Sequence, residues 1–399
     1  MDANHCGISV AKSGKWQSLS FCACQRLNPR RMKQMQLSEN AKVVLMLCCP
    51  FQAKSEEEEK NQVLSPGEWH SFAHLLKQRS LEPEDLLSLN YPQLEGLLEG
   101  DPLMKKVGAI HSLLRSGGTL SFHLESLGNR GIQVVTLVDD DYPERLRKRL
   151  GNQAPPFLFY AGDKALLGQP GIAVVGSRQI DQRVLQITRE LGEICGQAGL
   201  VVYSGGAKGV DETCMKAALE GVDGYTVGVL AHPLTEVMRT VEYRRAIEKK
   251  RMCLATPFLP EKGFQVWKAM YRNAIIYALA DVAVVIQSDL NKGGTWAGAK
   301  ENLKKRWVPL FVVDWGAQTP AGNRELIKQG GINLPHPYPF DGKSIKEWFQ
   351  QRVAGWKSSV LDEGDNSKAA PSRGEKAVQL SLSFPEAQKA GPDRAKKQQ

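Results

Sequence analysis

The feature that most constrains the fold of this chain is a short apolar run, Gly171-Ile-Ala-Val-Val-Gly-Ser-Arg178, which ends abruptly at a Gly-Ser-Arg turn. A run of β-branched residues that stops at such a turn predicts a buried parallel strand leading to a helix N-terminus. The pattern returns where Leu200–Tyr203 runs into the glycine loop Ser204–Asp211. Because freed backbone N–H groups and helix N-termini attract anions, the two units together predict a phosphate-binding, Rossmann-like sheet.

Three later segments, 225–230, 282–286 and 307–313, read as further strands, and a third glycine loop, Gly293-Gly-Thr295, follows the second of them. Residues 132–138 predict a lead-in strand. Residues 154–160 predict an extended edge segment, because paired prolines remove ladder donors. We therefore expect an α/β fold with a mostly parallel sheet, helices on both faces, and loops that converge on one edge.

Composition divides the chain into four parts. Residues 1–36 show no periodicity and predict a disordered or non-native leader. Residues 37–130 carry helical periodicity, and Ser65-Pro-Gly-Glu68 has the pattern of a capping box, so a small helical domain is expected. The Rossmann-like domain follows over 131–350, and the polar, charged segment 351–399 predicts a flexible tail.

Charge and cysteine usage narrow the class of protein. The 399 residues carry a net charge of +9, which favours a polyanionic partner, although a merely soluble basic protein has the same balance. The eight cysteines lack a CxxC spacing, so we expect reduced thiols in a cytoplasmic protein, with no metal and no cofactor. The apolar segment 43–49 is too short to cross a bilayer, which argues against a membrane role.

Two basic side chains stand out at the predicted phosphate loops. Arg178 has the geometry to fork a phosphate, or alternatively pairs with Asp181 as an ordinary surface arginine. Lys208 lies in the second loop and is expected to point the same way. Asp211 opens the next helix, where a carboxylate satisfies unpaired N–H groups, so we expect it to be a helix-capping residue. The basic run 244–251 is either a solvated helix face or an extension of the electrostatic track.

The tail contains one island of alternating polar and apolar residues. It is similar to the sliding-clamp binding motif of bacteria, which suggests a docking peptide, and an added edge strand is the alternative. The residues concerned are Gln379, Leu380, Leu382 and Phe384.

Six pieces occur in an order that resembles the bacterial DNA-processing protein A family (DprA, also Smf): Asp141-Tyr-Pro, Pro155–Tyr160, Ala173–Arg178, Ser204–Asp211, Arg272-Asn273 and Gly293-Gly-Thr. The resemblance implies a homodimeric protein that binds single-stranded DNA, protects incoming strands and loads a RecA-type recombinase during transformation or recombination, without being a catalyst. The sequence departs from the family at Ala274, where an arginine is usual, and at Met215, where histidine is frequent.

The resemblance also implies which residues contact DNA and its phosphates. By position these are Gly176, Ser177, Arg178, Ser204, Gly205, Gly206, Lys208, Gly209, Lys268, Arg272, Asn273, Gly293, Gly294 and Thr295.

Two other functions compete with this interpretation. Gly293-Gly-Thr with Glu301 downstream is similar to the motif of phosphoribohydrolases on a related fold, which suggests a nucleotide-binding sensor or enzyme. Glu301 lies among lysines well inside the following helix, which favours a solvent-exposed acid instead. An adaptor that works only through its tail motif is the third possibility.

Overall fold

The computed structural model describes residues 37–51 and 62–356. The predicted leader, residues 1–36, and the tail motif, Gln379–Phe384, lie outside these residues. Residues from Gln36 onward form one compact unit. A helix reaches Val353, so the structure is regular slightly beyond the predicted start of the tail at residue 351.

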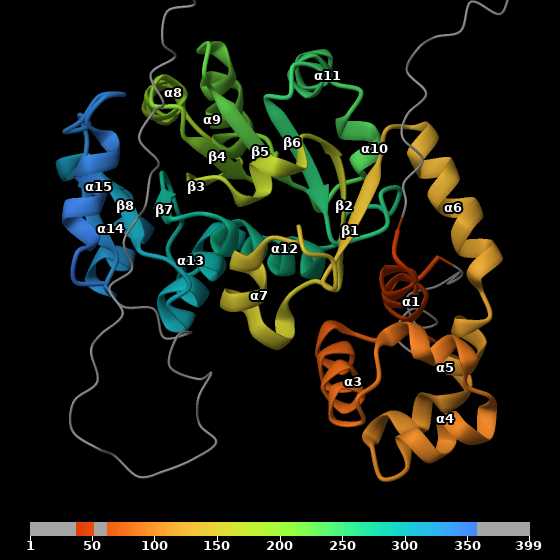
Figure 1. Cartoon of the computed structure of the whole chain (residues 1–399). Coiled ribbons are helices and arrows are strands. Elements are labelled where there is room, and N and C mark those ends of the chain that lie inside the picture. Colours follow the sequence, from red (N-terminus) through yellow and green to blue (C-terminus); the bar gives the residue numbers. More distant parts are fainter. Residues whose placement is uncertain (1–36, 52–61, 357–399) are drawn as a thin grey trace, which may run out of the picture. The chain divides into compact units, whose positions relative to one another are not determined.

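Short helices form the first part of the described chain (Figure 1). Ser38 begins the first of them by accepting a hydrogen bond from the Ala41 amide at 3.1 Å. Ser65 and Glu68 form the predicted capping box, which confirms that a helix begins at Pro66. The elements are α1 (Glu39–Cys48), α3 (Pro66–Gln78), η1 (Pro83–Ser88), α4 (Tyr91–Leu98), η2 (Pro102–Lys106), α5 (Val107–Leu114) and α6 (Gly117–Asn129).

Helix α1 joins this helical segment to the sheet. Its residues Val43 to Leu47 are buried almost completely, and it packs against strands β1 and β2 as well as against α5 and α6. A helix that is apolar on all sides requires such cover on every face. The helical segment therefore packs directly against one end of the sheet, and the predicted boundary at residue 130 falls between α6 and β1.

Within the described ranges the sheet has nine strands in the order β1-β2-β6-β5-β4-β3-β7-β8-β9. The pairs from β6 through β9 are parallel, and β2 pairs antiparallel with both β1 and β6. This confirms the predicted mostly parallel α/β fold. The strands are β1 (Gln133–Thr136), β2 (Phe157–Gly162), β3 (Gly171–Val175), β4 (Val201–Ser204), β5 (Tyr225–Val229), β6 (Met252–Thr256), β7 (Val282–Val285), β8 (Leu310–Asp314) and β9 (Ile332–Pro335).

One expectation about the sheet needs correction, and two of its strands were not predicted. The segment 154–160 was expected at an edge, but β2 is paired on both sides because Pro155 and Pro156 precede the strand and leave its ladder intact. Strand β6 directly follows the basic run and was not predicted. Strand β9 was also missed, since four residues that end in a proline give little local signal.

Helices cover both faces of the sheet, as predicted (Figure 1). Helices α8 and α9 pack against each other and against β4 on one face, whereas α12 packs with α7 and α13 on the other. Asp181 caps helix α8 by accepting a hydrogen bond from the Val184 amide. The helices are α7 (Glu144–Leu150), α8 (Gln182–Gln197), α9 (Val210–Glu220), α10 (Leu234–Val237), α11 (Val241–Glu248), α12 (Val266–Leu279), α13 (Gly293–Lys305), α14 (Ala321–Lys328) and α15 (Ile345–Val353), with η3 (Gly151–Gln153), η4 (Lys164–Gly168) and η5 (Gly316–Gln318).

Candidate functional site

The three glycine loops lie together at the carboxyl edge of the sheet. Strand β3 pairs with β4 on one side and with β7 on the other, so the loops that follow these strands are neighbours. The strand order also reverses between β3 and β7, which is where open α/β sheets bind ligands. The predicted convergence of the loops on one edge is therefore present in the structure.

Hydrogen bonds hold the three loops against one another. The Val210 amide donates to the Ser177 carbonyl at 3.2 Å, which joins the first loop to the second. The Thr295 hydroxyl donates to the Gly176 carbonyl at 2.8 Å, which joins the first loop to the third. The loops thus form one continuous surface, called here the glycine-loop rim and made of residues 176–178, 204–209 and 293–295.

Glycine is required where the first two loops meet. Gly209 has a φ of +89°, and a Cβ atom there would lie 2.4 Å from the Ser177 carbonyl oxygen. A Cβ atom at Gly176 would lie 2.5 Å from a methyl group of Val210. Any side chain at these positions would push the loops apart, so the rim depends on glycine at both.

Arg178 in the first loop and Lys208 in the second are both exposed to solvent. The Arg178 guanidinium lies 5.2 Å from the centre of the Phe264 ring, in a cation–π contact. Asp181 uses its carboxylate to cap α8, and no ion pair with Arg178 occurs among the described residues. Both cations are thus placed to meet an anion that arrives at the rim.

Phe264 and His232 are part of this surface and were missed by the sequence reasoning. Their rings are stacked with centroids 4.7 Å apart. Burial and the neighbouring charges of Arg178 and Arg272 lower the pKa of His232 below its usual value. The position of His232 just after β5 was the available signal, since β5 lies beside β4 and ends at the same edge.

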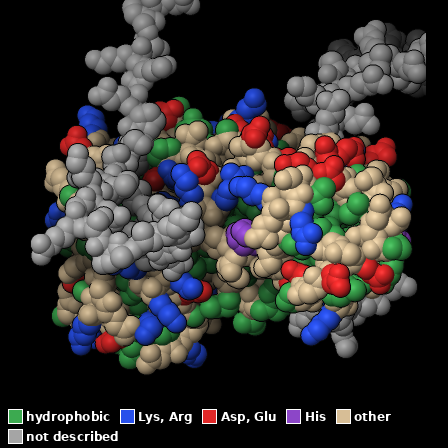
Figure 2. Space-filling model, turned by 60° about the horizontal axis from the view of Figure 1, so that its bottom comes forward, with side chains coloured by type: hydrophobic (Ala, Val, Ile, Leu, Met, Phe, Trp, Pro, Cys, Tyr) green, Lys and Arg blue, Asp and Glu red, His purple; other side chains and the backbone are tan. Residues whose placement is uncertain are grey.

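Figure 2 shows Lys and Arg side chains gathered beside a histidine near the middle of one face, with acidic and basic side chains mixed elsewhere on that face.

Arg272 and Lys268 correct the prediction, because neither presents its charge to solvent. Arg272 is only 4% exposed and pairs with Asp211, the two side chains being 3.7 Å apart. Lys268 is 3% exposed, and its ammonium lies 5.4 Å from the Phe258 ring centre and 5.7 Å from that of Trp267. Both residues lie on α12, which turns this face toward the sheet.

Asp211 holds the second loop and does not cap its own helix. Helix α9 has no side-chain cap, and the Asp211 carboxylate accepts a hydrogen bond from the Gly205 amide at 3.1 Å. Burial raises the pKa of Asp211, while the Arg272 guanidinium opposes that shift. The Gly205 amide is therefore already occupied, and a Cβ atom at Gly205 would overlap the Arg272 side chain.

Three other predicted contacts shape the rim from within. The Ser204 hydroxyl is buried and donates to the Val174 carbonyl at 2.6 Å. The Asn273 side-chain amide donates to the Gly294 carbonyl at 3.3 Å, which ties α12 to the third loop. Of the predicted residues, those at least partly open to solvent are Gly176, Ser177, Arg178, Gly206, Lys208, Gly209, Asn273, Gly293, Gly294 and Thr295.

Glu301, which the enzymatic alternative places in the reaction, lies away from the third glycine loop. Glu301 lies eight residues after the first residue of α13, which places it about 12 Å along the helix from the third loop. In residues 37–51 and 62–356 no group of His, Cys, Asp and Glu side chains is arranged to hold a metal ion. The described helices also include none that is long and apolar enough to cross a bilayer.

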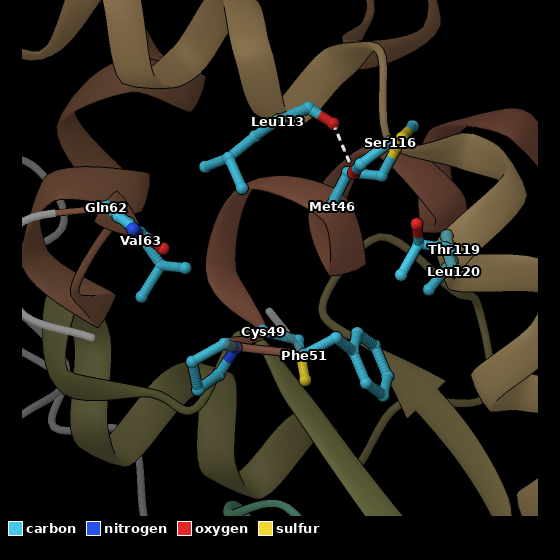
Figure 3. A pocket seen from close by; sticks show the side chains of 10 residues that line it. Met46, Cys49, Phe51, Gln62, Val63, Leu113, Ser116, Thr119 and Leu120 are labelled. Carbon is cyan, nitrogen blue, oxygen red and sulfur yellow. Dashed lines mark hydrogen bonds between the residues drawn. The ribbon is translucent and has the colours of Figure 1, made fainter. Parts of the chain in front are cut away.

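A small pocket in the helical segment is unrelated to the rim. Figure 3 shows its lining side chains, among them Met46, Phe51 and Leu120, and the hydrogen bond from Ser116 to the Leu113 carbonyl. The enclosed volume of about 10 Å³ barely accommodates one water molecule. We therefore treat it as a packing defect of the helices.

The structure is a Rossmann-like sheet whose glycine loops and exposed cations lie at one edge. The family model for DNA recombination-mediator protein A matches residues 133–336, a range that contains every described strand of the sheet, from β1 to β9. The match spans half of the chain, and the protein belongs to this family.

The named relatives are bacterial. The chain is 26% identical over 246 residues to the putative DNA processing protein DprA of Mycobacterium tuberculosis strain H37Rv, covering 58% of this chain and 61% of that protein. It is 38% identical over 205 residues to DprA of Streptococcus pneumoniae strain R6, covering 49% and 68%. It is 27% identical over 185 residues to protein Smf of Escherichia coli K12, covering 46% and 49%. The chain thus spans only about 61% of the length of the mycobacterial relative.

Two solved structures are also similar. DprA from Streptococcus pneumoniae superposes with a TM-score of 0.47 at 21% identity, covering 71% of this chain and 98% of that one. DprA from Helicobacter pylori, whose structure was described for its single-stranded DNA binding mode, gives 0.44 at 24% identity, covering 56% and 98%.

Proposed function

We propose that this protein is a recombination mediator that binds single-stranded DNA along the glycine-loop rim. The observation that carries the proposal is the convergence of three hydrogen-bonded loops below two solvent-exposed cations, Arg178 and Lys208. Backbone amides and arginine are the groups that proteins use to grip phosphate irrespective of base sequence. Membership of the recombination-mediator family and the net charge of +9 support the same substrate.

The binding of DNA phosphates by the rim should depend strongly on salt. Each phosphate contact with a single strand contributes a slope of about −0.7 in a plot of log affinity against log salt concentration. We expect Arg178→Ala to lower the affinity for every sequence by roughly tenfold or more and to reduce the slope by about 0.7. Fluorescence anisotropy with labelled single-stranded and duplex oligonucleotides over a salt series measures both quantities.

Arg79→Ala is the matched control, because Arg79 is an exposed arginine at the far end of α3. It should leave affinity and slope unchanged. An equal loss in both variants, or tighter binding of duplex than of single-stranded DNA, would contradict the proposal.

The finer parts of the proposal concern partners. We infer that the DNA-bound protein acts as a homodimer in the cytoplasm and loads a RecA-type recombinase, without catalysing a reaction itself. The tail motif at Gln379, Leu380, Leu382 and Phe384 would add an attachment to the sliding clamp. The support for these partners is the family resemblance and the pattern of the tail. Deletion of residues 378–384 followed by clamp pull-down tests the last of them.

A further inference from the structure

A groove of about 340 Å³ opens beside the glycine-loop rim and has no role in the contacts described so far. Its walls are almost entirely apolar and include the aromatic rings of Phe157, Phe258, Trp267 and Tyr271 together with five prolines. Helix α1 and the segment before α3 close one side, so the helical segment and the sheet both contribute. The volume suits one or two flat rings.

The groove lies on the same edge of the sheet as the rim. Phe258 follows the carboxyl end of β6, and Phe157 begins β2, which runs antiparallel beside it. Strand β6 is separated from β4 only by β5, and the His232–Phe264 stack stands after β5 between the two regions. A DNA strand that runs along the carboxyl edge of the sheet would therefore pass from the rim to the groove.

Helix α12 connects the two regions rigidly. Trp267 and Tyr271 face the groove, whereas Asn273, about one and two-thirds turns after Trp267, holds the third glycine loop. Six residues of helix span about 9 Å along the axis, so one short oligonucleotide is long enough to contact both.

The aromatic rings of the groove pack edge to face, and one of them, Trp267, is open to solvent. Trp267 is 49% exposed, and its ring meets that of Phe258 edge-on with centroids 5.5 Å apart. The buried Lys268 ammonium contacts both rings but does not itself line the groove. An exposed aromatic ring on the same edge of the sheet as the rim fits the flat bases of a nucleic-acid strand held at the rim.

We propose that this groove is a base-stacking subsite for unpaired nucleobases of the strand whose phosphates bind to the glycine-loop rim. The inference rests on the proposed function of the rim. It adds a contact with the bases, which distinguishes single-stranded from duplex DNA. Bases in a duplex are stacked inside the helix and cannot enter the groove, while every unpaired base offers a face to an aromatic ring.

The test compares variants on two single-stranded oligonucleotides of equal length, one of thymidines and one of abasic sites. Trp267→Ala should weaken binding of the thymidine oligonucleotide roughly five- to hundredfold, the range for one stacked base. Binding of the abasic oligonucleotide should not change, and Trp267→Phe should restore most of the affinity. Val266→Ala is the matched control, since Val266 is the exposed neighbour that does not line the groove.

Three results would overturn the inference: no loss with Trp267→Ala, an equal loss on both oligonucleotides, or an equal loss with Val266→Ala. If these occur while Arg178→Ala still weakens binding of both oligonucleotides, only the base subsite fails. If the wild-type protein binds neither oligonucleotide, the proposed function fails and the subsite with it.

A second measurement does not depend on any substitution. Photocrosslinking of the wild-type protein to a 5-iodouracil oligonucleotide should attach the base to Trp267, Phe258 or Tyr271, as mapped by mass spectrometry. Crosslinks confined to other parts of the chain would overturn the inference.

Discussion

Arg178 and Arg272 lie at the same set of loops but in opposite environments. Arg178 is on the surface of the rim, exposed to solvent beside Phe264. Arg272 lies beneath the rim, 4% exposed and paired with Asp211. A surface guanidinium remains available to a ligand, whereas a buried one is already committed to its counter-charge.

The contrast separates binding from support. The buried pair neutralises itself, and Asp211 in turn fixes the Gly205 amide, so this layer sets the shape of the second loop. The exposed cations add charge to a surface whose shape is already fixed. Substitutions in the lower layer should therefore change stability first, and those on the surface should change affinity alone.

The largest effect is expected from Arg272→Ala, which leaves the Asp211 carboxylate buried without its partner. Removal of one member of a buried ion pair costs about 3–5 kcal/mol of unfolding free energy. Urea denaturation measures this cost. Arg178→Ala should change the same quantity by less than about 0.5 kcal/mol, because Arg178 is on the surface. Similar costs in the two variants would erase the distinction between the layers.

The double variant Asp211→Ala/Arg272→Ala sharpens the same comparison. With both charges removed, no uncompensated charge remains buried, so the double variant should lose less unfolding free energy than the two single losses added together. Strict additivity would show that the two residues are not coupled.

A smaller effect is expected from Thr295→Val, which keeps the side-chain volume and removes the hydroxyl that donates to the Gly176 carbonyl. The loss of one such hydrogen bond costs about 0.5–1.5 kcal/mol of unfolding free energy. Thermal or urea denaturation measures it. A variant as stable as the wild type would show that the first and third loops are held together by other contacts.

The smallest expected effect is a pH dependence of DNA affinity, and it involves His232 on the surface of the rim. His232 has a lowered pKa, so it is neutral near pH 7 in the free protein. A DNA phosphate beside Arg178 adds negative charge, which raises the pKa of His232 and makes binding take up a proton. Affinity should therefore rise as the pH falls from about 8 to 6, by no more than about tenfold per pH unit for one proton.

His232→Asn tests this assignment, because it removes the titrating group. The variant should bind with an affinity that is flat over this pH range in the same anisotropy assay. If wild type and variant show the same pH dependence, another group takes up the proton.

Local patterns predicted much of the fold. The apolar runs at β3, β4 and β7 appear where the sequence indicated. Strand β6 was not predicted because Met252–Thr256 has one β-branched residue and directly follows a basic helix. Its place in the sheet is set by pairing with β5 and β2, which are distant in sequence.

The sequence by itself determined that glycine loops would follow parallel strands and meet at one edge, because strand period, turn chemistry and crossover handedness are local properties. It did not determine which basic side chains stay in solvent. Polar residues adjoin both Arg178 and Arg272, so the local sequence fits a phosphate contact at either arginine. Only the packing of α12 against the sheet buries Arg272. Burial depends on elements brought together from distant parts of the chain, so the tertiary structure alone decided which arginine can meet DNA.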